Sequence, residues 1–410
     1  QVGQDEIFVQ GQSGWCGAKY FPSDKIIKKV DKSVNIINNN GLFIKSIQAG
    51  SSQKTEAQGE QLSAIMNNII NISKETKKQA KRLWLDNIPE KILVDDVTKK
   101  HNIIKESNNI RAIIGEYDAP EKQEQGLVDI SLTESGNTMI LGTELSDREL
   151  ILKTITYSLC TTYSPEEINI YLIDYGSGVL AINKRFPQVG GIVSEGEADK
   201  QNSFLKMLSE TIQSRKKMLG ELGVDYKNYN TRSDVKKIPA IIVMINGLEV
   251  LIESYADMPD ELAKLTRDSE RYGIYYIINH NGMGTSRKLL QNFNNKLLLR
   301  FNDSGKYRDY FDTKINIYPK SVDGRGLIMH DIPHEFQTAL VTEKTEDFNN
   351  YIEEKAEQEK NKYSERAIPI PSLPDKIMFE DIEAYVKSIK KVPIGIIKEN
   401  IEVMKYNFVK

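Results

Sequence analysis

The sequence is poor in cysteine, with only Cys16 and Cys160 in 410 residues. Two cysteines cannot form the disulfide framework of a small secreted protein, so we expect a reduced, cytosolic setting. The chain also lacks long apolar runs, and stretches such as residues 240–245 are far too short to span a bilayer. A formal net charge of −3 gives no basic footprint for nucleic acid. The chain opens on Gln1 without a methionine, and we interpret it as a piece of a longer polypeptide.

Between about residues 110 and 345, short apolar stretches alternate with polar-faced segments of helical periodicity. This alternation predicts an α/β fold with a mostly parallel sheet that is covered on both sides. The expected strands are 111–115, 127–130, 138–141, 168–173, 240–245, 274–278, 296–299 and 325–329. The expected helices are 147–163, 199–222, 249–256, 259–272 and 286–292.

The two flanks of this region have a different character. Strands are expected at 6–10, 34–37 and 42–47, and an amphipathic helix within 51–80. After the central region we expect a charged helix at 345–365, a proline-punctuated linker at 368–374 and a short helix at 381–389. The end of the chain, residues 394–403, echoes residues 114–123, and 8–10 more weakly echo 336–338. We interpret this as one complete unit between the tail of one copy and the head of the next.

The segment around Gly142 lacks the residues of a phosphate-binding loop. A P-loop reads G-x-x-x-x-G-K-[ST], where backbone amides cradle the phosphates, the lysine reaches the terminal ones and the hydroxyl holds Mg²⁺. If Gly142 is the first glycine, then Asp147, Arg148 and Glu149 occupy the positions of the second glycine, the lysine and the hydroxyl. At an effective dielectric of roughly 20, each carboxylate near a phosphate costs on the order of 4 kcal/mol. Arg148 could offset one of them by pairing with Asp147 or Glu149.

The apolar segment 238–246 lacks an acid at its end. A Walker B strand is a buried apolar run ending in an acid that binds Mg²⁺ or its water. Here the run ends in Asn246, and a neutral amide cannot supply the charge that a hard cation needs. Glu249 is close in sequence but is expected to begin the next helix. Two independent segments therefore lack catalytic residues.

Three other polar positions are candidates for the site, and two of them have two interpretations each. Asp174 ends a strand before two glycines, which suits either a ligand site in an α/β sheet or an Asp-capped turn. Arg271 suits a helix C-terminus with a glycine stop or a finger that reaches a neighbouring subunit. Asn281, after His280, follows a strand where a γ-phosphate sensor would lie. The spacing of His330 and His334 would place them on one helix face, but Pro333 argues against a helix, and we expect no metal site.

The order and spacing of the motifs resemble one family. The relevant segments are 114–118, Gly142, 173–178, 186–190, 215–218, 239–243, 271–274, 324–327 and 335–339. They are similar to the FtsK/SpoIIIE-type ATPase domain, specifically the tandem domains of the membrane-bound coupling ATPase of type VII secretion in Gram-positive bacteria. Residues 3–17 resemble the end of the preceding ATPase domain, and 81–91 resemble an interdomain linker.

The resemblance implies a RecA-like P-loop NTPase fold and a set of domain boundaries. Residues 1–50 would be the tail of a preceding ATPase domain, 51–90 a helical linker, 91–345 the ATPase-like domain, 346–390 a second helical linker and 391–410 the start of a following domain. It also implies a position at the cytoplasmic face of the cell membrane, within a larger anchored protein. The implied partners are adjacent ATPase domains, small helical-hairpin secreted substrates and other membrane components, with a homo-oligomer left open and no nucleic acid expected.

Active members of the family carry the lysine, the hydroxyl and the Walker B acid, whereas this chain has Arg148, Glu149 and Asn246. Our leading hypothesis is a non-hydrolysing domain that binds no cofactor and acts structurally, in regulation or in substrate docking. The alternative is an active ATP-driven translocase of protein or DNA that uses ATP and Mg²⁺ with unusual residues. A third hypothesis is a peptide-docking module with an apolar groove on the vacated nucleotide face.

Overall fold

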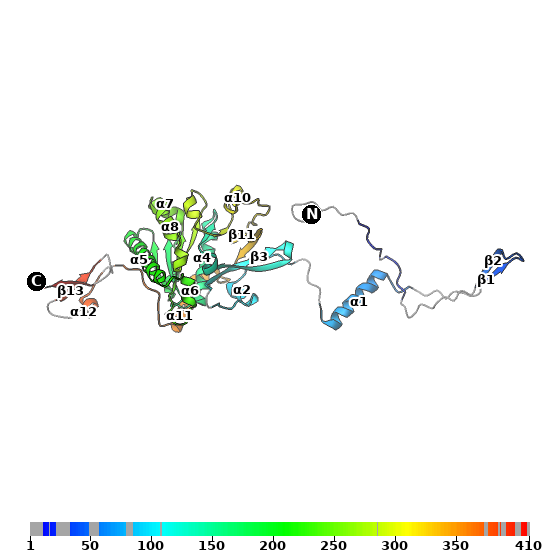
Figure 1. The fold of residues 1–410 in the computed structure, drawn as a ribbon, viewed down its shortest axis with the longest axis horizontal. Helices are drawn as coiled ribbons and strands as arrows, with labels where there is room; N and C mark the ends of the chain where they lie inside the picture. Colours follow the sequence, from blue (N-terminus) through cyan, green and yellow to red (C-terminus); the bar gives the residue numbers. More distant parts are fainter. Residues whose placement is uncertain are drawn as a thin grey trace. The chain divides into compact units, whose positions relative to one another are not determined.

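The computed structural model describes residues 11–15, 17–21, 33–48, 57–78, 85–106, 109–284, 286–372, 376–383, 386, 391–397 and 403–407. The chain divides into two units, Gln1–Leu83 and Trp84–Lys410 (Figure 1). The expected strand at 6–10, the segment 81–84 of the resemblance and most of 384–390 lie outside the described residues. No helix in these described ranges is both long and apolar enough to cross a membrane.

The second unit is built on a ten-stranded mixed sheet in the order β4-β3-β12-β11-β10-β5-β9-β8-β6-β7. Neighbouring strands from β10 to β7 run parallel, and those from β4 to β10 pair antiparallel. The strands are β3 (Arg111–Ala119), β4 (Glu124–Ser131), β5 (Thr138–Leu141), β6 (Ile168–Asp174), β7 (Val189–Ser194), β8 (Ala240–Asn246), β9 (Ile274–His280), β10 (Asn295–Leu298), β11 (Arg325–Met329) and β12 (Pro333–Thr338).

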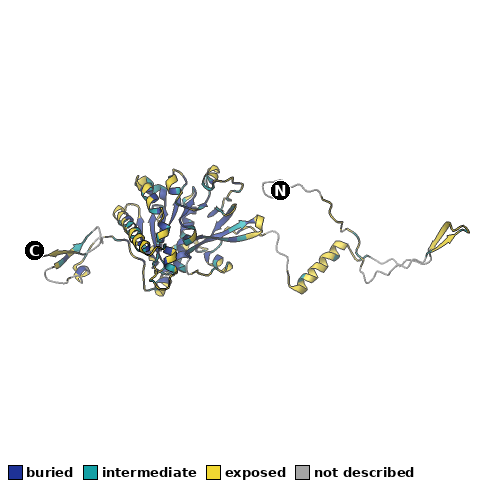
Figure 2. Cartoon of the chain, in the orientation of Figure 1, coloured by how far each residue is buried: buried dark blue, intermediate teal, exposed yellow. Residues whose placement is uncertain are grey.

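Helices cover both faces of the sheet, which explains why its central strands β6, β8 and β9 are buried at every position and mostly apolar. In β8, Ile242 and Met244 face one core, whereas Ile241, Val243 and Ile245 face the other. The first core includes side chains of α4 (Leu145–Thr162) and α11 (Phe348–Lys362), and the second includes those of α5 (Ala198–Leu222), α7 (Leu248–Ser254) and α8 (Met258–Thr266). Figure 2 shows buried strands at the centre and exposed helix surfaces around them.

Two strands were not expected, and both have tertiary reasons. β12 follows the His330–Pro333 turn, and it pairs between β11 and β3. β7 contains two glycines, and its sequence is typical of a loop. In the structure it is the edge strand of the sheet, and the expected linker lies along it. Ile370 donates its amide to the carbonyl of Gly190 at 3.3 Å. A Cβ at Gly190 would lie 2.3 Å from the carbonyl oxygen of Ile368, so glycine permits this close covering of the edge.

Helix boundaries differ from expectation in several places. The expected helix at 259–272 is α8 followed by a separate 3₁₀ turn, Ser269–Tyr272, because Asp268 adopts a left-handed conformation with φ of 58°. The expected helices at 286–292, 345–365 and 381–389 are α9 (Arg287–Leu290), α11 and α12 (Phe379–Glu383). Four short helices were not expected: α2 (Val94–Lys100), α3 (Leu132–Ser135), α6 (Tyr226–Thr231) and α10 (Gly305–Phe311).

The first unit contains a hairpin and a helix. Strands β1 (Ser33–Ile37) and β2 (Phe43–Gln48) pair antiparallel, and α1 (Gln61–Thr76) begins later than expected. No residue of α1 is buried. The apolar stripe that predicted this helix is exposed: Ile65 is 44% exposed and Ile69 is 53% exposed. Within the described residues, this stripe therefore has no packing partner.

The order of elements in the first unit recurs at the end of the chain. Hairpin β1–β2 and α1 precede the sequence Ile-Pro-Glu-Lys-Ile at 88–92, then α2 and hairpin β3–β4. Hairpin β11–β12 and α11 precede Leu-Pro-Asp-Lys-Ile at 373–377, then α12 and the hairpin of β13 (Lys391–Ile396) and β14 (Val403–Asn407). The registers of β3 and β13 both shift immediately before a glycine, Gly115 and Gly395. The echo found in the sequence thus extends to local structure.

Candidate functional site

The carboxyl ends of the parallel strands bring most of the predicted site residues together. Asp174 and Asn246 are register partners at the ends of β6 and β8, and Leu141 pairs with His280 at the ends of β5 and β9. Gly142 and Asn281 follow directly, so they lie at the same edge. Arg271 precedes β9 and therefore lies at the opposite end of that strand. It is not part of this cluster.

The loop between β5 and α4 is only three residues long. Helix α4 begins at Leu145, two residues before the expected start, and residues 147–149 are buried near its beginning. The amides of Gly142 and Thr143 donate to the carbonyls of His280 and Arg300 at 3.2 and 2.9 Å. A phosphate cradle needs loop amides that face the ligand. These two amides are already used within the protein.

Arg148 forms a bidentate ion pair with Glu249 at the start of α7. Its Nη1 and Nη2 atoms donate to the two carboxylate oxygens at 3.1 and 2.6 Å. The expectation that Arg148 pairs with Asp147 or Glu149 is therefore wrong: successive helix residues point about 100° apart, so neighbours on α4 face different elements. Burial alone would raise the pKa of Glu249, but the hydrogen bonds and charge of Arg148 hold that pKa below its ordinary value.

The charge of Asp147 is neutralised by a different residue. Arg300, which follows β10, donates to its carboxylate from Nε at 3.2 Å and from Nη2 at 3.0 Å. The amide of Gly324 donates to the other oxygen at 3.1 Å. Asp147 therefore fixes α4 to two distant loops. Arg300 is not among the predicted site residues, and no local motif could have revealed it.

Glu149 and Asp174 share one amide, that of Asn246. The Nδ2 atom of Asn246 donates to Glu149 at 2.9 Å and to Asp174 at 2.7 Å, and Asn279 donates to its Oδ1 at 2.7 Å. Ser177 donates to Glu149 from its backbone amide at 2.9 Å and from its hydroxyl at 2.8 Å. A carboxylate at position 246 could not donate and would add a third negative charge. The amide is the side chain that this network requires.

The remaining polar side chains at this edge are bound within their own loops. Asp174 accepts the amides of Gly176 and Leu180, each at 3.1 Å, which is the Asp-capped turn. Asn281 accepts the amide of Met283 at 2.8 Å. Burial lowers the pKa of His280 to about 4, with smaller contributions that oppose it from Glu249 and support it from Arg148. Among the described residues, no three His, Cys, Asp or Glu side chains are grouped to hold a metal ion.

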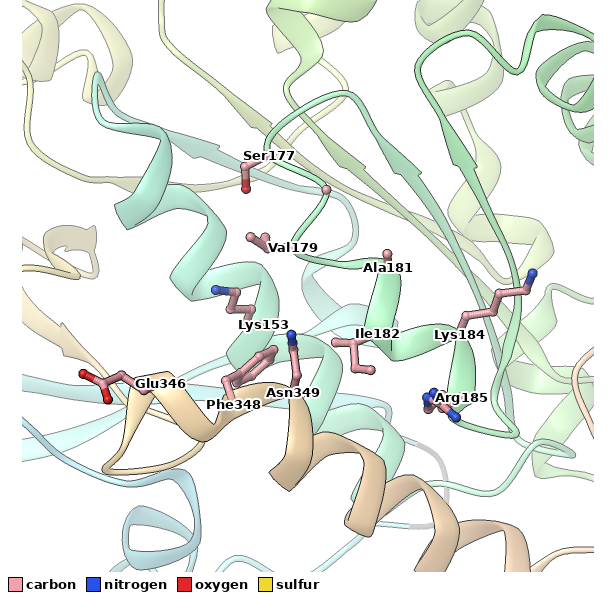
Figure 3. A pocket seen from close by; sticks show the side chains of 11 residues that line it. Lys153, Ser177, Val179, Ala181, Ile182, Lys184, Arg185, Glu346, Phe348 and Asn349 are labelled. Carbon is pink, nitrogen blue, oxygen red and sulfur yellow. The ribbon is translucent and has the colours of Figure 1, made fainter.

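An open pocket of about 900 Å³ lies beside this network, next to Ser177 (Figure 3). It is bounded by α4, the loop after β6, the 3₁₀ turn Ala181–Arg185 and the start of α11. The open space thus lies next to the buried network of residues 147–149.

The comparisons with known proteins match this architecture. A model of the FtsK/SpoIIIE family matches residues 103–314, just over half of the chain. The chain belongs to the FtsK/SpoIIIE family. Its similarity to curated members includes the type VII secretion system protein EssC of Staphylococcus aureus (strain MRSA252), with 25% identity over 98% of this chain and 28% of that protein. It also includes the ESX secretion system protein YukB of Bacillus subtilis (strain 168), with 24% identity over 98% of this chain and 27% of that protein.

Solved structures of FtsK/SpoIIIE-type domains show the same fold. EssC (ATPases 2 and 3) of Geobacillus thermodenitrificans superimposes with a TM-score of 0.70 at 23% identity, covering 79% of this chain and 62% of that one. Thermomonospora curvata EccC (ATPases 2 and 3), in complex with a signal sequence peptide, superimposes with a TM-score of 0.61 at 20% identity, covering 74% of this chain and 57% of that one. The RecA-like P-loop NTPase fold that the resemblance implied is confirmed. This chain spans little more than a quarter of the length of its curated relatives.

Proposed function

We propose that this FtsK/SpoIIIE domain does not hydrolyse ATP and acts as a structural and regulatory domain of a type VII secretion ATPase. The ion pair between Arg148 and Glu249 carries this proposal. The side chain at the lysine position of the loop is 3% exposed and already holds a carboxylate in bidentate geometry. A phosphate could recruit Arg148 only by leaving the partly buried Glu249 without its partner, which is unfavourable.

The surrounding charges favour the same function. Glu149 stands where active members carry the Mg²⁺ hydroxyl, and its carboxylate is held by Ser177 and Asn246. Asn246 stands where the Walker B acid would lie, and it is committed to Glu149, Asp174 and Asn279. A triphosphate would have to displace several internal bonds and then lie near two carboxylates. We infer that the network stabilises the domain in the way that a bound ligand would.

The curated relatives support placing this domain in type VII secretion. In that setting its partners are adjacent ATPase domains of the same polypeptide, small helical-hairpin substrates and membrane components of the secretion system. The domain would lie at the cytoplasmic face of the membrane, within a larger anchored protein. It would hold its neighbours in register, regulate an active domain through its interfaces and contribute to substrate docking.

Isothermal titration calorimetry with Mg-ATP tests the proposal directly. We expect no saturable heat at micromolar to millimolar nucleotide and no phosphate release above the uncatalysed rate. A matched sample of Arg148→Ala controls for weak binding through the arginine. Micromolar binding of Mg-ATP at ordinary salt would overturn the proposal.

The second candidate is an active ATP-driven translocase with non-standard residues. Arg148 lies at the lysine position of the loop and Arg300 contacts Asp147 beside it, and cations there are what a polyphosphate needs. This function requires multiple-turnover phosphate release that Arg148→Ala abolishes. A DNA translocase would also bind duplex DNA with strong salt dependence.

A further inference from the structure

The open pocket beside the buried network has the size of a ligand site. Its volume of about 900 Å³ falls within the range of roughly 300–1,000 Å³ typical of such sites. Figure 3 shows Lys153 of α4 on one wall, Val179 and Ile182 on another, and Phe348 and Asn349 from the start of α11. The site residues described above, apart from Ser177 at its end, do not line it.

Lys153 supplies a positive charge that, among the described residues, has no protein anion as its direct partner. Its side chain is half-buried on α4, and among the described residues its ammonium makes no hydrogen bond or ion pair. Its Nζ lies 4.9 Å from the centre of the Phe348 ring, a cation–π contact. Burial lowers the pKa of Lys153, and the more distant charge of Glu149 opposes this shift. An ammonium partly withdrawn from water gains most from an anion of its own.

The other cationic side chains that line the pocket, Lys184 and Arg185, do not place a second free positive charge near Lys153. Arg185 is paired with Glu353 at 2.8 Å. Lys184 is exposed and extends away from Lys153 and the centre of the pocket (Figure 3). Glu346 contributes a negative charge at the rim. One available cation matches a ligand group with a single negative charge, and it does not match a triphosphate.

The walls around Lys153 are apolar. Val179, Ile182 and Phe348 pack against the core on one side and line the pocket on the other. Two neutral polar side chains, Ser177 and Asn349, also line the pocket and can bond the amides of a backbone. An extended peptide uses the cation, the apolar walls and these polar groups, whereas an alkyl chain has no use for the polar groups.

We propose that this pocket binds an extended peptide segment that places an Asp or Glu side chain on Lys153 and an adjacent aliphatic side chain against Val179, Ile182 and Phe348. The partner is thus a protein with an exposed acidic residue between aliphatic neighbours. The inference does not depend on the proposed lack of ATPase activity, because it uses neither Arg148 nor Glu249.

Fluorescence polarisation with two labelled pentapeptide pools tests this site on the whole chain. Both pools carry random aliphatic neighbours around a central residue, which is glutamate in one pool and glutamine in the other. We expect saturable binding of the glutamate pool and binding of the glutamine pool that is weaker by about tenfold, because a charge-assisted hydrogen bond is lost. Lys153→Met should reduce binding of the glutamate pool to that of the glutamine pool.

Two variants and one competitor complete the experiment. Lys184→Met removes a cation from the same rim and should leave binding unchanged, and Ile182→Ser should weaken both pools. Thermal melts of each variant verify folding. Equal binding of the two pools, no binding at millimolar peptide, or full binding by Lys153→Met would each overturn the proposal. Displacement by laurate with greater affinity than either pool would assign the pocket to a fatty-acid carboxylate instead.

Discussion

At the scale of single residues, each charged side chain at positions 147–149 has a partner elsewhere in the fold. Arg148 is held by Glu249, Asp147 by Arg300, and Glu149 by Asn246. Arg148 and Asp147 therefore lie in ion pairs, whereas the carboxylate of Glu149 is held by hydrogen bonds from a neutral amide. Removing one member of a buried ion pair leaves the charge of the other uncompensated. A change at one position therefore restricts which side chains its partner position can hold.

Arg148→Met should lower the free energy of unfolding by about 3 kcal/mol, because it leaves Glu249 partly buried without a cation. The double variant Arg148→Met, Glu249→Leu should recover most of this loss, since it removes both charges. Urea unfolding of the four members of this cycle measures the coupling. A double variant no more stable than Arg148→Met would show that the pair does not account for the loss.

At the scale of elements, close backbone contacts determine where strands join. Gly115 of β3 lies against β12, and a Cβ placed there would lie 1.8 Å from the carbonyl oxygen of Gln337. Gly395 holds the corresponding position in β13, next to the same kind of register shift, but nothing lies within 4 Å of its Cβ position. The two hairpins thus share a glycine next to a register shift. Within the described residues, only the glycine of the first hairpin has another strand packed against it.

Gly115→Ala should destabilise the sheet by about 2–3 kcal/mol, because β3 and β12 must move apart. Gly395→Ala is the matched control and should leave the midpoint of thermal unfolding within a degree or so of the original. Calorimetry of both variants provides the comparison. Equal effects at the two positions would contradict the assigned role of the β12 contact.

At the scale of the whole molecule, the repeated order of elements supports the proposed division into one unit and parts of two others. The helices α1 and α11 follow equivalent hairpins, yet Ile352 of α11 is fully buried and Ile65 of α1 is exposed. We propose that β1, β2 and α1 together close a preceding unit. This would assign α1 to that unit rather than to a linker beginning at residue 51. The segment 374–407 would open a following unit.

Ile352→Lys should cost about 4 kcal/mol or more, because it buries an unpaired charge in the core beneath α11. Ile65→Lys should leave the unfolding of the second unit unchanged and reduce self-association of the chain, because it polarises an exposed apolar stripe. Thermal melts and sedimentation of both variants make the comparison. A lower melting temperature in Ile65→Lys would mean that α1 packs on the second unit.

The sequence alone determined the fold class, most of the parallel strands and the absence of the standard nucleotide residues. These features depend on short stretches of sequence. A strand that is buried on two faces is a continuous apolar run, and the nucleotide residues form a short motif at the end of a strand. It also placed Asp147, Arg148, Glu149, Asp174 and Asn246 at one edge, because parallel strands end on the same side.

Only the tertiary structure decided how those side chains pair. Arg148 and Glu249 are 101 residues apart, and Asp147 and Arg300 are 153 apart, so no local pattern could link them. The edge strand β7 was equally hidden, because its glycines make sense only once residues 367–370 lie against it. Local periodicity fixes which face of an element is buried, whereas the identity of a charge's partner depends on where distant loops meet.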